Sequence, residues 1–235
     1  MVCAVLEDRK TNTRRIMDPQ PDEEGVNYMP TPPALDWEIE YGCEWKPWIW
    51  DTEGGERIAQ HCRYGGLNDL LYVRETHYRF GYWEEEPAVS PGQHKWKFVP
   101  DTDTTAVYFE QNRPLAFRIS RDTLYPEKRQ WYKRLGRFMP KEYARIWLQV
   151  TDIRAERLHD IDGYGAVWEG AAILPSAARS MTSARIDYEL SAPGYVMKFK
   201  KLWESIHGPG SWEANPWVWV VAFKVLSKTG KPQNP

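Results

Sequence analysis

The sequence predicts an α+β protein in which helices flank one mixed β-sheet or small barrel. Three stretches carry this prediction. Residues 143–158 alternate apolar and polar side chains with a period of two, which is typical of a strand with one buried face. Residues 195–207 place apolar side chains at helical spacing, and residues 217–225 are rich in the β-branched and aromatic residues that favour strands. We expect one domain over residues 1–226, followed by a tail over 227–235.

The remaining regular elements follow from shorter patterns. Residues 1–9 carry apolar side chains at helical spacing and predict a short helix. Residues 70–76 follow a turn and read as a strand, and residues 106–109 and 115–119 predict two more short strands.

A second short helix is expected over residues 160–170. Asp160 or Asp162 is suited to cap its start, because a side-chain oxygen there can accept a free backbone N–H. Gly170 lies where a glycine commonly ends a helix in the left-handed conformation. The helix over 195–207 is expected to end in the same way at Gly208.

Three stretches show little periodicity and are expected to be irregular. Residues 18–60 contain many Pro and Gly, which forbid long helices. Residues 80–105 are polar with Gly and Pro, and residues 171–192 are also loop-like.

Composition excludes several classes of protein. The chain has 235 residues, 13 of them Trp, and 14% aromatic residues, which excludes a disordered chain. A net charge of −2 excludes a generally basic nucleic-acid coat protein. The longest apolar run, Trp217 to Phe223, is too short to span a bilayer, and the first residues lack the pattern of a signal peptide.

The three cysteines form no CxxC pair, so we expect a reducing bacterial cytoplasm rather than a disulfide framework. Zinc ligation by Cys43, His61, Cys62 and His77 is an alternative, but their spacing is irregular. We therefore expect neither a metal nor a cofactor.

The tryptophans divide into two groups. One group falls in predicted helices and strands and is expected to pack in the core: Trp147, Trp168, Trp203, Trp217 and Trp219. The other falls in irregular segments and consists of loop anchors or stacking platforms: Trp37, Trp45, Trp48, Trp50 and Trp83.

The highest density of candidate functional side chains is in residues 9–15, which combine four cations with two threonine hydroxyls. Such a cluster suits a phosphate or a carbonyl oxygen. In an extended chain Lys10, Asn12 and Arg14 would share one face. The other face would then carry Thr11, Thr13 and Arg15. The alternative is a solvated charged turn after the first helix.

Glu169 is the second candidate. It closes the short helix next to Trp168, and an aromatic neighbour that keeps water away from a carboxylate would suit acid–base work. The alternative is an ordinary surface glutamate.

Blocks of the chain, taken in order, resemble a known family. They are residues 1–15 with Arg9-Lys10-Thr11-x-Thr13-Arg14-Arg15, residues 62–76 with Tyr72-Val73-Arg74-Glu75-Thr76, residues 139–158, Glu169-Gly170, residues 199–203 and residues 212–220. This order of blocks is similar to phage and prophage proteins of the ASCH family.

The resemblance implies a PUA-like fold, which is a small mixed β-barrel with flanking helices and a cleft beside the barrel. Proteins of this group mostly contact RNA or modified bases, so RNA or a modified nucleoside is the expected partner. Residues 18–60, 78–105 and 171–192 would then be insertions that close over a substrate or bind a protein partner.

A small bacterial relative in this family removes the acetyl group from N4-acetylcytidine with a Lys, a Thr and a Glu. These fall on Lys10, Thr13 and Glu169, which the resemblance thus implies as catalytic, with Thr13 or water as the nucleophile. Asp8 replaces the family's usual glycine and tolerates the left-handed turn expected there. The implied substrate-binding residues are Arg9, Thr11, Arg14, Arg15, Tyr72, Arg74 and Glu75.

Three other functions stay open. The same cleft could bind RNA or a modified base without catalysis. Lys10 and Glu169 could instead serve as the acid–base pair of a single-strand ribonuclease. The chain could also be a phage assembly or host-takeover protein that acts through its inserted loops. The oligomeric state is likewise open.

Overall fold

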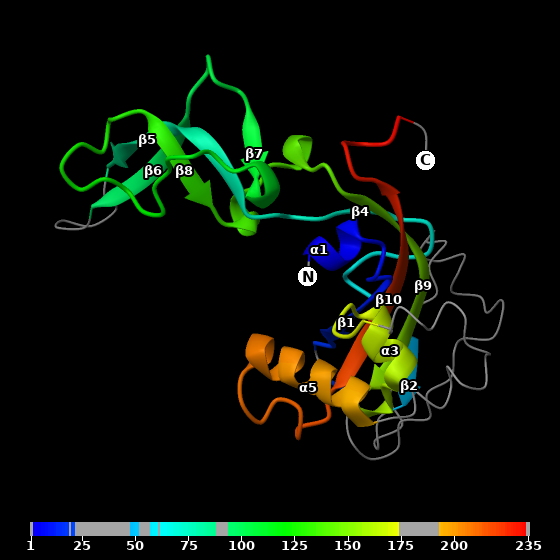
Figure 1. Ribbon diagram of the computed structural model, residues 1–235. Helices are drawn as coiled ribbons and strands as arrows, with labels where there is room; N and C mark the ends of the chain where they lie inside the picture. Colours follow the sequence, from blue (N-terminus) through cyan, green and yellow to red (C-terminus); the bar gives the residue numbers. More distant parts are fainter. Residues whose placement is uncertain are drawn as a thin grey trace. The chain divides into compact units, whose positions relative to one another are not determined.

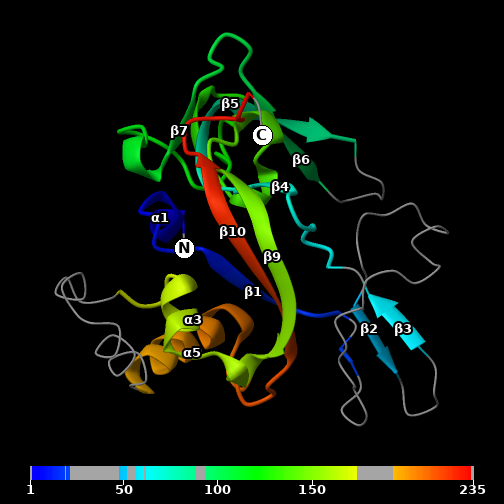
Figure 2. The ribbon, with the colours of Figure 1, turned by 90° about the vertical axis from the view of Figure 1, so that its right-hand side faces the viewer.

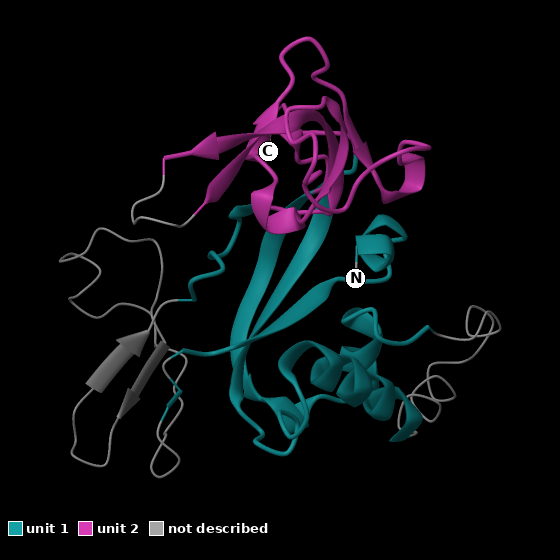
Figure 3. Cartoon of the chain, turned by 90° about the vertical axis from the view of Figure 1, so that its left-hand side faces the viewer, with its two compact units in different colours: residues 1–71, 147–228 teal, residues 72–146, 229–235 magenta. Residues whose placement is uncertain are grey.

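The computed structural model describes residues 2–18, 20–21, 48–51, 57–60, 62–87, 94–173 and 193–233. The chain divides into two compact units (Figure 3). Unit 1 comprises Met1–Leu71 and Trp147–Lys228, and unit 2 comprises Tyr72–Ile146 and Thr229–Pro235. The architecture is α+β, with mostly antiparallel strands and few helices, as the sequence predicts.

Unit 1 is built on a curled four-stranded sheet. The strands are β1 (Asn12–Ile16), β10 (Trp217–Ser227), β9 (Trp147–Arg157) and β4 (Leu70–Tyr72), in that order across the sheet. β10 pairs antiparallel with both β1 and β9, and Figure 2 shows β9 and β10 as long twisted strands. The predicted long strand and closing strand are therefore the centre of this sheet, and β1 is one of its edges.

Both faces of β10 are covered, because its alternate residues enter two different cores. Trp219 and Val221 pack in a cluster with Met17, Cys62, Val150 and Ala155. Val218 and Val220 pack in a second cluster. Its other members are Leu158, Ile161, Ala166, Phe199 and Trp203. A strand buried on both faces has few positions for polar residues, which explains the apolar run at 217–223.

The described part of unit 1 holds three α-helices: α1 (Val2–Leu6), α3 (Gly163–Trp168) and α5 (Pro193–His207). α3 and α5 lie on the same side of the sheet (Figure 2), where they complete the second cluster. Asp162 caps α3 by accepting a hydrogen bond from the Gly165 backbone N–H at 2.7 Å, and Gly170 follows the helix at φ +73°. The predicted start and stop of this helix are confirmed.

The stretch expected to be irregular at 18–60 holds two short strands. β2 (Trp48–Asp51) pairs antiparallel with β3 (Arg57–Gln60). Residues 22–47 and 52–56 lie outside the described residues, as do residues 174–192 of the third stretch.

Unit 2 is a second antiparallel sheet, centred on β5 (His77–Glu86). β5 pairs with β6 (Lys95–Pro100), with β7 (Val107–Phe109) and with β8 (Gln130–Arg134). The expectation of a loop over residues 80–105 is therefore wrong. Charged residues at Glu84–Glu86 and the central glycine Gly81 hide the period-two pattern. Gly81 is needed because a Cβ there would meet the Val99 carbonyl oxygen at 2.3 Å.

Two other strand predictions also need correction. Residues 115–119 form no strand, and only an isolated bridge joins Arg118 to Tyr132. Leu115 and Ile119 are exposed, so no packed surface holds this segment extended. The strand expected over 70–76 ends at Tyr72. Short 3-10 helices complete the described part of unit 2, at Glu110–Asn112, Gly136–Phe138 and Lys141–Tyr143.

Three of the five tryptophans expected in the core are buried, and Trp217 is partly buried. Trp147, Trp203 and Trp219 are buried, whereas Trp168 is 44% exposed, against expectation. Trp83 is an anchor in the aromatic core of unit 2, where it contacts Phe98 and Tyr132 edge to face. Trp37 and Trp45, and the side chains of Trp48 and Trp50, lie outside the described part of the chain. None of the helices described is long and apolar enough to cross a membrane.

Candidate functional site

The turn between α1 and β1 (Figure 1) carries Lys10 two residues before the edge strand begins. Asp8 adopts φ +55°, the left-handed conformation expected there. The backbone N–H groups of Arg9 and Lys10 then both donate to the Ala4 carbonyl, at 2.8 and 3.0 Å. The next backbone N–H, of Thr11, donates to the Trp168 carbonyl at 2.8 Å, which ties this turn to the end of α3.

The predicted alternation of the basic segment is confirmed. Lys10, Asn12 and Arg14 are 5%, 5% and 4% exposed, whereas Thr11, Thr13 and Arg15 are partly exposed. The alternative of a solvated charged turn is therefore wrong. Two buried cations on one face of an edge strand need partners, because an uncompensated charge is costly to bury.

Glu169 is the partner of Lys10. It lies at the C-terminal end of α3 and is 4% exposed, so it is not an ordinary surface glutamate. Lys10 Nζ donates to Glu169 Oε2 at 2.6 Å and to the Glu169 carbonyl oxygen at 2.9 Å. Burial lowers the pKa of the Lys10 ammonium from its ordinary 10.5, and the attraction of Glu169 opposes this shift.

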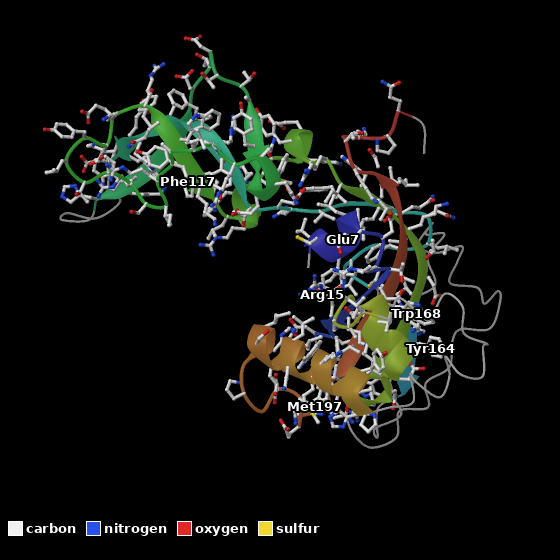
Figure 4. All side chains as sticks on the ribbon, viewed as in Figure 1. Glu7, Arg15, Phe117, Tyr164, Trp168 and Met197 are labelled. Carbon is white, nitrogen blue, oxygen red and sulfur yellow. The ribbon has the colours of Figure 1, made fainter. Side chains whose placement is uncertain are left out.

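Close packing at Gly170 explains the burial of Lys10 and Glu169. Trp168, which was expected to keep water from Glu169, does not explain it. Trp168 and its neighbour Tyr164 lie on α3 (Figure 4), and the Trp168 side chain is 44% exposed. At Gly170, by contrast, a Cβ would meet Ala4 Cβ at 2.8 Å and Lys10 Cβ at 3.2 Å. The backbone at the end of α3 thus lies directly against α1 and Lys10, and this contact excludes water.

Arg14 extends the pair into a network. Its Nη1 is 3.4 Å from Glu169 Oε1, and its Nη2 is 3.0 Å from Glu156 Oε2. Glu156 also binds Arg154, which pairs with Asp152 at 3.1 Å. The Nε of Arg14 is buried and has no acceptor among the described residues. Cations and carboxylates therefore alternate from Lys10 to the surface of β9, and the network holds Arg14 rigidly beside Glu169.

A small pocket adjoins this network on the side of α5. Glu169, Thr13, Arg14 and Arg15 border it, together with α5 residues Phe199, Leu202, Trp203, Ile206 and His207. Its volume of about 20 Å³ is room for about one water molecule. Because β1 is an edge strand, side chains from both of its faces reach this pocket. Figure 4 shows Arg15 on the side of unit 1 that carries α5.

The predicted catalytic residues are thus close together, but not equally so. Lys10 contacts Glu169 directly, whereas Thr13 shares only the pocket with Glu169. Within the described part of the chain, no hydrogen bond joins the Thr13 hydroxyl to either residue. Thr13 lies on the opposite face of β1 from Lys10, which follows from the alternation of the strand.

His207 is a pocket residue that sequence reasoning missed. Burial and the positive charge of Arg15 lower the pKa of its imidazole. Its position in the last turn of the predicted amphipathic helix is the signal that could have indicated it. Nothing in the sequence, however, shows that this turn faces residues 13–15.

The remaining predicted binding residues have other roles in the structure. Arg9 pairs with Glu7 at 2.6 Å, and Thr11 acts through its backbone. The three residues from the predicted cleft strand, Tyr72, Arg74 and Glu75, belong to unit 2.

Within unit 2, Arg74 donates to the Tyr72 hydroxyl at 3.0 Å. Both oxygens of Glu75 bind Arg145, at 3.0 and 2.7 Å, in a bidentate pair with Glu75 only 4% exposed. Glu75 therefore binds another residue of unit 2, and it is not a free second carboxylate.

The site offers proton transfer rather than metal ligation. A buried amine lies 2.6 Å from a buried carboxylate, so a proton can pass between them. Across the described ranges, no cluster of three or more His, Cys, Asp or Glu could hold a metal ion. Cys3 and Cys62 are free thiols, and Cys43 and His61 lie outside the described residues.

Comparison of the chain with known protein families, with curated proteins and with solved structures found no match.

Proposed function

We propose that unit 1 is a PUA-like domain of the ASCH type that hydrolyses the N-acyl amide of a modified nucleoside such as N4-acetylcytidine, free or within RNA. The observation that carries this proposal is the buried pair of Lys10 and Glu169, joined at 2.6 Å beside a pocket that Thr13 borders. These are the three positions at which the sequence resembles the acetylcytidine amidohydrolase. The substrate class comes from that resemblance.

The chemistry follows from a proton shared by the pair. In the neutral form of the pair, Lys10 is an amine and Glu169 is a carboxylic acid. Lys10 accepts a proton from the attacking water or from the Thr13 hydroxyl as the new C–O bond forms at the acyl carbon. Glu169 donates its proton to the amide nitrogen as the C–N bond breaks. One water is consumed, and the products are the free amine of the base and acetic acid.

Two further groups fit this reaction. Arg14 and Arg15 border the pocket and can stabilise the oxyanion that develops on the acyl oxygen. If Thr13 attacks first, it forms an acyl ester as the amine leaves, and the one water consumed then hydrolyses this ester to acetic acid and free Thr13. The pocket, with a volume of about 20 Å³, has room for the attacking water.

The test is hydrolysis of N4-acetylcytidine, as the nucleoside and within an RNA oligonucleotide, followed by chromatography of the deacetylated product. We expect Lys10→Met and Glu169→Gln to lower kcat/KM about 100-fold or more, because each removes one partner of the proton transfer. Matched controls are Lys228→Met and Glu7→Gln, which alter exposed ion pairs of the same unit. Both controls should retain wild-type activity.

Each other result has a definite meaning. A wild-type protein inactive on both substrates contradicts the proposal, as does a Lys10→Met variant that stays active. Retention of the acetylated nucleoside without hydrolysis would identify a binding module. Cleavage of the RNA strand itself would identify the ribonuclease alternative.

A further inference from the structure

Unit 2 carries a second concentration of charge, on one face of its sheet. β5 and β8 pair so that His77 lies opposite Arg134 and Arg79 lies opposite Tyr132. Residues opposite one another in an antiparallel pair, and residues two apart on a strand, share a face. Arg79, Arg134 and His77 are therefore neighbours on one face of the sheet.

The guanidinium group of Arg134 lies among aromatic rings rather than carboxylates. Its Cζ is 4.5 Å from the ring centroid of Phe98, 5.0 Å from that of Trp83 and 4.9 Å from that of Phe138. In the described part of unit 2, neither a carboxylate nor a hydrogen-bond acceptor contributes to the pKa of Arg134, although its guanidinium group carries five N–H donors. Such an arginine is oriented by stacking, and its donors are left free for a ligand.

Arg79 adds a second positive charge without a carboxylate. In the described part of unit 2 it stacks on Tyr143 at 4.6 Å and donates to the Tyr143 hydroxyl at 3.2 Å. Burial and the charge of Arg79 lower the pKa of Arg134. Burial also lowers the pKa of the adjacent His77, so this imidazole adds no charge. Two half-buried cations that repel each other are stabilised by a bound anion.

An exposed aromatic ring lies beside these cations. Phe138 is 51% exposed, and the Cζ atoms of both Arg134 and Arg137 are 4.9 Å from its ring centroid. Arg137 is exposed, and its guanidinium group stacks on this ring. A ring that is open to solvent and flanked by two guanidinium groups suits a ligand with alternating flat bases and phosphates.

The surrounding segment favours a polyanion over a single small anion. Residues 113–141 contain nine Lys and Arg but only two Asp and Glu, in a chain whose net charge is −2. This basic segment includes β8 and the 3-10 helix Gly136–Phe138. A phosphate backbone would neutralise several of its cations at once.

We propose that Arg79, Arg134, Arg137 and Phe138 form a binding site for single-stranded nucleic acid, in which the guanidinium groups pair with phosphates and Phe138 stacks on an unpaired base. The strand must be single, because a base within a duplex does not present its face to a ring. This site lies in unit 2 and needs no hydrolysis at Lys10.

The test is fluorescence anisotropy of a labelled 20-nucleotide uridine RNA with the full-length chain. We expect half-saturation at about 10⁻⁶ M or below in 50 mM salt. Arg134→Gln should weaken binding about tenfold and lower the salt dependence by about one counterion. Phe138→Ala should weaken binding about tenfold through lost stacking, and should bind an abasic strand of the same length as well as the wild type does.

Arg113→Gln is the matched control. Arg113 lies in the same basic segment, but its charge is already paired with Glu110 at 3.1 Å, so its loss should change binding less than twofold. Phe138→Ala is an exposed substitution that tests the site even if Arg134→Gln fails to fold.

Three results would overturn the proposal. They are no binding of the RNA in 50 mM salt, equal weakening by Arg113→Gln and Arg134→Gln, or equal affinity for a poly-glutamate peptide of the same charge. The last result would indicate an acidic protein partner. The free nucleoside is one of the two substrates of the amidohydrolase assay and does not need the unit 2 site, so the two proposals can fail separately.

Discussion

Lys10 could be predicted as a site residue from the sequence, but the residues that surround it could not. The alternation of the basic segment correctly placed Lys10, Asn12 and Arg14 on one face. The partner of Lys10, however, lies 159 positions along the chain, on the end of α3. Pairing a buried amine with a buried carboxylate costs desolvation of both groups, and packing of the two must supply that free energy. The ion pair is therefore a result of the fold rather than a cause of it.

The lowered pKa of Lys10 gives a prediction for stability against pH. Between the lowered pKa of the folded state and 10.5, the unfolded chain holds more protons at Lys10 than the folded chain, so this group makes the free energy of unfolding increase with pH there. Lys10→Met removes the effect. We expect the difference in free energy of unfolding, wild type minus Lys10→Met, to rise between pH 8 and pH 10 in urea titrations.

Lys228→Met, at an exposed ion pair with Asp8, controls for the loss of a lysine. A difference that falls with pH for Lys10→Met would mean that the attraction of Glu169 outweighs burial, and would contradict a lowered pKa of Lys10.

At the scale of elements, predictions from short sequence patterns were correct where capping, chain reversal or helical periodicity decides the structure. Asp162 caps α3, Gly170 ends it in the left-handed conformation, and α5 buries Phe199 and Trp203. The rules failed where pairing with a distant strand decides the structure. β5 and β6 lie in a polar stretch, and they are strands because their backbones pair with each other.

Gly170 provides a prediction at this scale. Gly170→Ala should lower the free energy of unfolding by about 2 kcal/mol, because φ is positive there and the new methyl group would lie 2.8 Å from Ala4 Cβ. Chemical denaturation measures this loss. Gly194→Ala, in the first turn of α5 with open space around it, should leave stability unchanged or raise it slightly. Equal losses at both positions would show that the contact with α1 is unimportant.

At the scale of the whole molecule, the described residues form two four-stranded sheets with separate cores, besides the β2–β3 pair. The core of unit 1 surrounds β10, whereas that of unit 2 consists of edge-to-face aromatic rings around Tyr132. The chain enters unit 2 at Tyr72, the last residue of β4, and leaves it before β9, so unit 2 is a continuous piece except for residues 229–235. The prediction of one domain over residues 1–226 stays a prediction.

Separate cores imply separable stability. Tyr132→Ala, at a site 1% exposed, should lower the protection of β5 and β8 amides by about 3 kcal/mol. The amides of β9 and β10 should keep their protection in hydrogen-exchange mass spectrometry. Equal loss of protection in both sheets would show that the two units unfold as one.

The sequence by itself determined the α+β class, the central strands, the amphipathic helix and the choice of Lys10 and Glu169 as candidates. The first three follow from periodicity, capping and turn chemistry, which act over a few residues, whereas the two candidates came from the local cluster of charges and from the family resemblance. Only the tertiary structure decided that Lys10 binds Glu169, that His207 lines the pocket, and that Glu75 forms an ion pair with Arg145. It also decided that Arg134 lies among aromatic rings, with no carboxylate acting on it in the described part of the chain. The physical reason is that burial and charge pairing depend on groups far apart in the chain, and no local pattern records which of them meet.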